Sequence, residues 1–238
     1  MLKPQSGVVL LLMALMLLIA SATFALARLP ISSGYYPLDE ENALANAKIH
    51  LLAYLIGHEA GDYRLPFPDR NGDPQGYDGR ADCVTVNLTA EHRLGRYPWL
   101  GDVDPGGCQN RSLGIEFYDP AGEPIWYAVA EALLEHNDCQ NRACRWLSLL
   151  NERGELISDR IAFLLISAGK VVTGQDRSAA APNASAFLDV YQWGGQVESN
   201  ADFDEVFIQA GVTEGFNDRL EFVTVDELPA IVQAALLQ

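Results

Sequence analysis

The chain's densest group of oxygen-bearing side chains lies in a polar loop between residues 69 and 78. Oxygens at alternate positions suit a hard cation such as Ca²⁺, as in the first half of an EF-hand loop. The second half is missing, because Pro74 and Arg80 stand where an EF-hand places Gly and Glu. The sequence therefore predicts either a Ca²⁺ site or a solvated turn here, and no other cofactor. The candidate metal ligands are Asp69, Asn71, Asp73 and Asp78.

The cysteines form a second candidate set: Cys83, Cys108, Cys139 and Cys144. An even number of cysteines in a chain with an export segment favours disulfide bonds. The most local of the possible pairings joins Cys83 to Cys108 and Cys139 to Cys144, and we prefer it. Zinc is the alternative, but no C-x-x-C spacing occurs and the histidines do not fall at zinc-finger intervals.

The sequence contains no motif for hydrolytic catalysis. G-x-S-x-G and H-E-x-x-H are both absent, and we expect the thiols to be oxidised. A glycosidase-type pair of carboxylates needs only proximity in space, which sequence spacing among 32 acidic residues does not reveal. We therefore predict no catalytic residue and a protein that is not an enzyme.

Composition excludes one class of partner. The 238 residues carry a net charge of -16 and no cluster of Lys or Arg, so binding to a phosphate backbone is disfavoured. Apolar and aromatic residues are spread along the chain beyond its N-terminal segment, which lets that part bury one core. Nucleic acid is therefore not an expected partner, and one globular domain is.

An uncharged apolar segment spans residues 8–27, between Lys3 and Arg28. Its length suffices to cross a hydrocarbon core of about 30 Å as a helix, which predicts a transmembrane helix over 8–29. The same segment has the basic start, apolar core and small-residue end of a secretory signal peptide, with cleavage after Ala27. The segment alone does not decide between these interpretations.

The short leader MLKPQSG adds a third interpretation. It resembles the leader of type IV prepilins and type II secretion pseudopilins, which prepilin peptidase cuts after the Gly, here between Gly7 and Val8. In that family the apolar helix stays in place as an anchor and later packs into a filament. The family usually has Glu at the fifth residue of the mature chain, where this chain has Leu12. The resemblance therefore implies a minor or accessory subunit.

Beyond this segment the chain changes character. Residues 30–37 are rich in Pro and Gly, which break a helix. A new helix is predicted from Asp39, because acidic residues suit its first turn and apolar residues follow at helical spacing as far as Ile56. After Gly61 short β-prone runs predict strands, which indicates an α+β fold. These runs cover residues 83–88, 161–166 and 220–225.

Several further segments together resemble a group of bacterial prepilin-like proteins and follow the same order. They are residues 43–54, 65–69 with 71–73, 94–101, 125–129, 174–177, 216–219 and 225–228. The chain departs from that group at Phe67, where the group tends to have Cys, and in an insertion around Cys139 and Cys144. The resemblance implies a structural component of a type IV pilus or a type II secretion pseudopilus.

The combined expectation is a leader over 1–7, a transmembrane helix over 8–29, a break over 30–37 and an extracytoplasmic domain over 38–238. The expected fold is α+β and pilin-like, with an amphipathic helix packed on a small, mostly antiparallel sheet. The expected location is the bacterial inner membrane, crossed once, with the domain in the periplasm or in an extracellular filament. The implied partners are other pilin-like subunits, membrane assembly machinery, prepilin peptidase and the lipid bilayer. The alternative is a soluble periplasmic or secreted binding module or hydrolase, released by signal peptidase after Ala27.

Overall fold

The longest strand, β4 (Leu156–Ser167), pairs with three others in a six-stranded sheet. Residues 161–166 form an unbroken apolar run with every side chain buried, as a strand covered on both faces requires. This run and the one over 220–225 confirm two of the strands predicted from the sequence. The antiparallel neighbours of β4 are β2 (Trp126–Val129), β3 (Leu147–Asn151) and β8 (Arg219–Thr224).

Two strands extend this sheet on either side. β1 (Leu94–Arg96) pairs antiparallel with β2, and β7 (Val206–Gln209) pairs parallel with β3. A separate hairpin consists of β5 (Val190–Trp193) and β6 (Gln196–Ser199). Short 3₁₀ helices join the strands: η1 (Ala90–Arg93), η2 (Glu131–Leu133), η3 (Ala184–Ala186) and η4 (Val225–Glu227).

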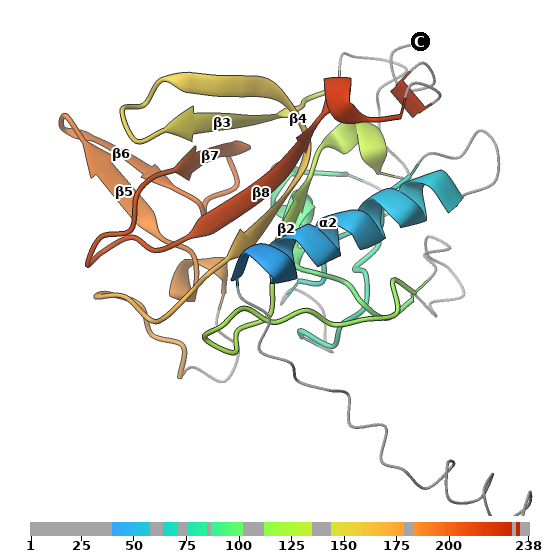
Figure 1. Cartoon of the computed structure of the whole chain (residues 1–238), viewed down its shortest axis with the longest axis horizontal. Coiled ribbons are helices and arrows are strands. Elements are labelled where there is room, and N and C mark those ends of the chain that lie inside the picture. The colour runs from blue at the N-terminus through green and yellow to red at the C-terminus, as the bar shows by residue number, and fades with distance from the viewer. Residues whose placement is uncertain are drawn as a thin grey trace, which may run out of the picture. The chain divides into compact units, whose positions relative to one another are not determined.

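Helix α2 (Glu40–Gly57) crosses the sheet in front of β4 and β8 and contacts both strands (Figure 1). An ion pair between Lys48 and Glu221 links the helix to β8. On the sheet, the helix meets Phe163, Leu165 and Val223, which belong to the same core cluster. The buried helical residues recur at the predicted spacing: Ala43, Leu44, Ala47, Leu51 and Leu55.

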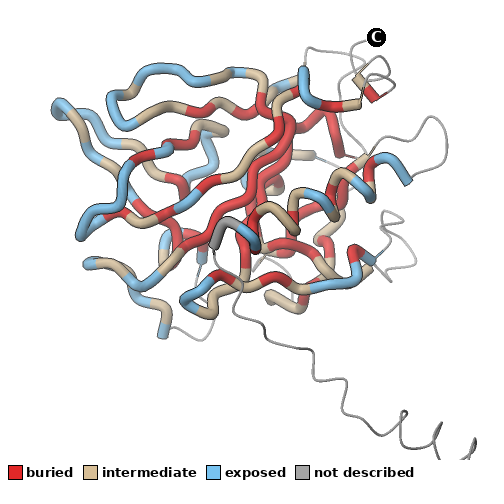
Figure 2. The backbone as a smooth tube through the Cα atoms, in the orientation of Figure 1, coloured by how far each residue is buried: buried red, intermediate tan, exposed pale blue. Residues whose placement is uncertain are grey.

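The other side of β4 faces a second apolar cluster. Leu164 and Ile166 from β4 lie there with Trp126 from β2 and Phe187, which follows η3. Figure 2 shows buried positions concentrated along the central strands, with exposed positions toward the strand ends and turns. The central sheet is therefore buried on both faces, and it holds β1 and β2 in fixed positions.

The computed structural model describes residues 40–57, 64–70, 76–84, 87–101, 112–134, 144–178, 183–229 and 232–233, all within a compact unit over Pro37–Gln238. The predicted leader, its cleavage site at Gly7 and Val8, the helix over 8–29 and the break over 30–37 lie outside the described residues. Within them, no helix is both long and apolar enough to cross a membrane. The predicted transmembrane helix and the predicted single-pass inner-membrane location thus have no support in the described part of the chain, and both expectations are corrected to that extent.

The predicted fold class is wrong. Strands predominate in the structure, and α2 is the one long helix among the described residues. The buried apolar residues of that helix form a stripe that packs on the sheet. The sequence predicted too few strands because several strands have only three to five residues, which is too short for a periodic pattern.

The buried stripe of α2 should account for its contribution to stability. Leu51→Ala removes a fully buried side chain and should lower the free energy of unfolding by about 2 to 5 kcal/mol. Ile49→Ala, on the same helix but 59% exposed, should change it by less than about 0.5 kcal/mol. Urea unfolding of both variants measures the difference. Equal losses would show that α2 packs through another face.

Candidate functional site

A small pocket of about 150 Å³ lies where parts of the chain far apart in sequence meet: residue 69 with residues 77–79, residues 96–99, and residues 116 and 124. We call it the Asp69 pocket. Trp99 and Pro124 form part of its wall. The side chains that give it its chemistry are Asp69, Tyr77, Asp78, Arg96, Tyr97 and Glu116.

Two glycines allow these segments to meet. A Cβ at Gly95 would lie 2.3 Å from the carbonyl oxygen of Asp69, so only glycine lets the chain approach β1 this closely. In that position the N–H of Asp69 donates to the carbonyl of Arg96 (3.0 Å), and the N–H of Arg96 donates back (2.7 Å). Gly79 has a φ of +84°, and a Cβ there would overlap the indole of Trp99. The backbone therefore fixes where Asp69 lies.

Asp69 is buried at the pocket, with 2% of its surface exposed. Its Oδ2 accepts a hydrogen bond from the N–H of Gly79 (2.8 Å), whereas its Oδ1 has no partner. Burial raises the pKa of this carboxyl to about 8, with further upward contributions from Asp82 and Asp78. The raised pKa favours the protonated form of this carboxyl near neutral pH. Oδ1 is the oxygen without a partner, and it has almost no accessible surface.

Arg96 and Tyr97 present two more polar atoms without partners. The guanidinium of Arg96 lies 4.1 Å from the ring centroid of Tyr77 and 5.0 Å from that of Phe187, so it packs against two aromatic rings. Its charge also acts on Asp69, where it lowers the pKa of the carboxyl against the effect of burial. Its Nε is buried and makes no hydrogen bond, and the same is true of the Tyr97 hydroxyl. Burial also raises the pKa of Tyr97.

Asp78 and Glu116 contribute carboxylates to the same pocket, and both side chains are half-buried. Asp78 also accepts a hydrogen bond from the N–H of Arg80 (2.8 Å) and lies 3.5 Å from its guanidinium. Buried polar atoms without partners are rare in native proteins. Three residues that line the Asp69 pocket have such an atom, and Asp78 and Glu116 add two carboxylates to the lining.

Of the predicted metal ligands, Asp69 and Asp78 come together in this pocket, while Asn71 and Asp73 lie outside the described residues. The carboxylates close enough to share a cation, within the part of the chain that the structure describes, belong to other residues. The predicted Ca²⁺ site thus stays a prediction.

Sequence reasoning missed Arg96, Tyr97 and Glu116 as site residues, although the segment 94–101 was noted for its resemblance to prepilin-like proteins.

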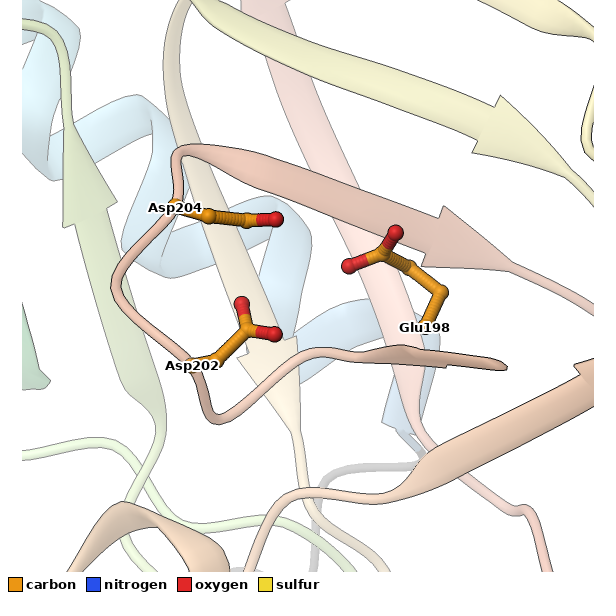
Figure 3. A group of neighbouring side chains, drawn as sticks. All are labelled: Glu198, Asp202 and Asp204. Carbon is orange, nitrogen blue, oxygen red and sulfur yellow. The ribbon is translucent and has the colours of Figure 1, made fainter. Parts of the chain in front are cut away.

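The three carboxylates that lie close enough to share a cation belong to Glu198 at the end of β6 and to Asp202 and Asp204 in the turn before β7. Their oxygens lie within 4.8 Å of one another, and Figure 3 shows the three carboxyl groups gathered around one turn. Partial burial and the neighbouring Asp204 raise the pKa of Asp202 to about 7. The spacing E-x₃-D-x-D was the available sequence signal, and it is too common on exposed acidic turns to be informative.

A larger groove of about 550 Å³ borders residues 172–175 and 188–192. Its buried carboxylate, Asp189, holds the chain in place: it accepts from the Nε2 of Gln175 (2.7 Å) and from the N–H of Asp218 (3.0 Å). Burial raises the pKa of both aspartates. None of the described residues lining this groove has a buried polar side-chain atom without a partner, so the Asp69 pocket is the better candidate.

Two of the four cysteines lie among the described residues. Cys83 and Cys144 are each disulfide-bonded, yet no two described cysteines lie at disulfide distance, which excludes a bond between these two. Cys108 and Cys139 lie outside the described residues. The preferred pairing therefore stays a prediction.

Comparison of the chain with protein-family models, with curated proteins and with solved structures gives no match. The site's own geometry must therefore define the class of protein. A concave pocket with a few convergent polar groups and aromatic walls is the usual form of a small-molecule site, and such pockets usually begin at about 300 Å³. The Asp69 pocket, at about 150 Å³, is smaller than that.

The buried carboxyl of Asp69 should make stability depend on pH. Because the pKa of Asp69 is about 8 in the folded chain and ordinarily 3.8, the folded state binds the extra proton between these values. Stability from this group is therefore fully present below about pH 4 and is lost as the pH rises to about 8. Asp69→Asn cannot titrate, so its melting temperature relative to wild type should rise across that window. Asp159→Asn, at an exposed position of β4, is the control and should show no such trend. A constant difference for Asp69→Asn would contradict the pKa assignment.

Proposed function

We propose that this chain is an exported, non-enzymatic binding protein whose Asp69 pocket takes up a small polar ligand. The observation that supports it is that three residues lining one pocket, Asp69, Arg96 and Tyr97, each have a buried polar atom without a partner. Leaving a buried polar group unpaired costs about 1 to 3 kcal/mol. These atoms have almost no accessible surface, so a ligand pairs with them, and recovers that free energy, only when the side chains that line the pocket shift.

Export rests on two further observations. Cys83 and Cys144 are disulfide-bonded, which is typical of compartments outside the cytoplasm. The apolar segment over 8–27 ends in Ala25, Leu26 and Ala27, a sequence suited to signal peptidase. We propose cleavage after Ala27, which leaves Arg28 as the first residue of the mature chain.

The non-enzymatic role rests on the contents of the pocket. Among the described residues that line it there is no Ser, Cys, Thr or His, so this part of the lining offers no hydroxyl, thiol or imidazole for covalent catalysis. Arg96 is held between aromatic rings, and Asp69 keeps its proton near neutral pH. These groups suit recognition of a ligand by hydrogen bonds.

The mature N-terminus tests export directly. The chain expressed in a bacterium and recovered from outside the cytoplasm should begin at Arg28 by mass spectrometry. A start at Val8 would contradict this proposal and would favour the pilin-like assembly role, which otherwise stays a prediction from the sequence.

Ligand binding is tested by thermal melting of the mature chain with neutral sugars, amino acids, short dicarboxylates and Ca²⁺ added separately. At about a hundred times its dissociation constant, a ligand of the native state should raise the melting temperature by about 5 to 10 °C. Arg96→Gln should reduce this shift, whereas Arg160→Gln, an exposed arginine paired with Asp226, should keep it. If no compound class shifts the melting temperature, or if Arg96→Gln responds as wild type does, the proposal fails.

A further inference from the structure

We infer that the larger groove takes an extended, positively charged peptide segment of a partner protein, which pairs as an added strand with the free edge of β5. This inference goes beyond the proposed function, because the groove and the Asp69 pocket share no described lining residue. Its basis is an unprotected strand edge that borders a groove without basic side chains in its described lining.

One edge of β5 has backbone groups without partners. The hairpin of β5 and β6 stands apart from the six-stranded sheet (Figure 1), and just before β5 the carbonyl of Asp189 accepts from the N–H of Asn200 (3.0 Å). Hydrogen-bonded pairs alternate along an antiparallel ladder, so Val190 and Gln192 direct their N–H and C=O groups away from β6. Within the described part of the chain, no group hydrogen-bonds to the backbone of these two residues.

The larger groove runs along this edge. Successive side chains of a strand point to opposite faces, yet the groove borders Val190, Tyr191 and Gln192 in succession. A groove that touches both faces of one strand lies at the edge of that strand. Residues 172–175, 213 and 215–216 border the same groove.

The volume of the groove matches a short stretch of extended chain. An extended residue takes up about 3.3 Å along its strand, about 4.8 Å to the next strand and about 10 Å between packed faces, which gives about 160 Å³. The groove's volume of about 550 Å³ therefore holds about three extended residues. This length corresponds to the segment of β5 from Val190 to Gln192 that borders the groove.

β5 lacks the features that usually protect a free strand edge. Such edges are normally blocked by Pro, by charged side chains or by a bulge. The sequence of β5 is Val-Tyr-Gln-Trp, and its pairing with β6 has no break in register. The edge of β1, by contrast, is covered by the backbone of Asp69. An open, uncharged edge suits the addition of a peptide strand, whose backbone supplies the missing hydrogen bonds.

Hydrogen bonds fix the walls of the groove. The Nε2 of Gln175 donates to the carbonyl of Phe187 (2.6 Å), and its Oε1 accepts from the N–H of Val172 (3.2 Å). The N–H of Thr213 donates to the carbonyl of Phe216 (2.7 Å). A groove formed in advance lowers the entropic cost of binding.

Charge selects a basic partner. No Lys or Arg is among the described residues that line the groove, and the exposed Asp176 and Glu214 are sequence neighbours of lining residues. Of the bases two residues away from the lining, Arg177 is paired with Glu123, and Lys170 borders a separate pocket. The net charge of -16 attracts cationic segments and repels a second copy of the chain.

Apolar side chains complete the fit. Leu188 and Phe216 line the groove and are buried. A segment that alternates apolar and basic residues turns one set to each face when it is extended. Its apolar set can then pack on Leu188 and Phe216, while its basic set faces the acidic surroundings.

Binding is tested with the full chain and a fluorescent seven-residue peptide of alternating Lys and Val, by fluorescence polarisation. This peptide should bind, and the same peptide with Glu in place of Lys should bind at least about 10-fold more weakly. A third peptide carries an N-methyl group on every internal residue, which removes its N–H donors and keeps its charge. It should also bind at least about 10-fold more weakly, since strand addition needs those donors.

Gln192→Pro tests the edge itself, because it removes an N–H that points away from β6 and leaves the hydrogen bonds of the hairpin in place. The affinity for the Lys–Val peptide should fall about 3- to 10-fold. Val197→Pro, directly opposite on β6, is the matched control and should keep the affinity.

A second variant applies if melting shows that Gln192→Pro disturbs the fold. Gln192→Lys adds a positive charge at the groove and should weaken binding of the Lys–Val peptide about 2- to 5-fold at low salt. Gln209→Lys adds the same charge at an exposed position of β7 and should have a smaller effect.

Each contrary outcome overturns a separate part of the inference. Equal binding of the N-methylated peptide would exclude strand addition, and equal binding of the Glu peptide would overturn the charge class. Self-association of the chain in sedimentation, abolished by Gln192→Pro and without peptide binding, would assign the edge to a second copy. No binding of the Lys–Val peptide at about 1 mM would overturn the inference and leave the proposal for the Asp69 pocket standing.

Discussion

The close approach of the Asp69 segment to β1 is the constraint on which the candidate site depends. It requires glycine at position 95, and it is held by the two backbone hydrogen bonds between Asp69 and Arg96. These bonds bury a carboxyl that would otherwise be solvated, and the cost of that burial appears as the raised pKa of Asp69. Local backbone pairing thus determines both the position and the protonation state of the central group.

The sheet holds β1, and with it the backbone of Arg96, in position. Residues 161–167 of β4 are buried, and this strand holds β2, which in turn holds β1. Trp126 of β2 contacts the ring of Tyr77, with centroids 5.8 Å apart, and Tyr77 in turn supports the Arg96 guanidinium. A fully packed core therefore extends through aromatic contacts to the polar pocket, which lets buried donors remain in place without partners of their own.

The sequence predicted the elements with long, consistent patterns. The helix from Asp39 and the apolar run over 161–166 correspond to α2 and β4, because each depends on burial of one continuous stripe. The predicted strand over 83–88 is wrong where the structure describes it, since residues 83–84 and 87–88 have no strand structure. Asp69 and Asp78 were identified as functional from their oxygen ligands, but as parts of a metal loop. Arg96, Tyr97 and Glu116 come from two other segments, and only the fold brings them to the same pocket.

The central claim is that a protonated Asp69 carboxyl lies in the pocket with one free oxygen. Titration of the aspartate side-chain carboxyls by ¹³C NMR, with Asp69→Asn used to assign the resonance, measures this directly. The structure predicts that the Asp69 resonance changes with a midpoint near pH 8. A midpoint near the ordinary value of 3.8 would show a solvated carboxylate and would contradict the site described here.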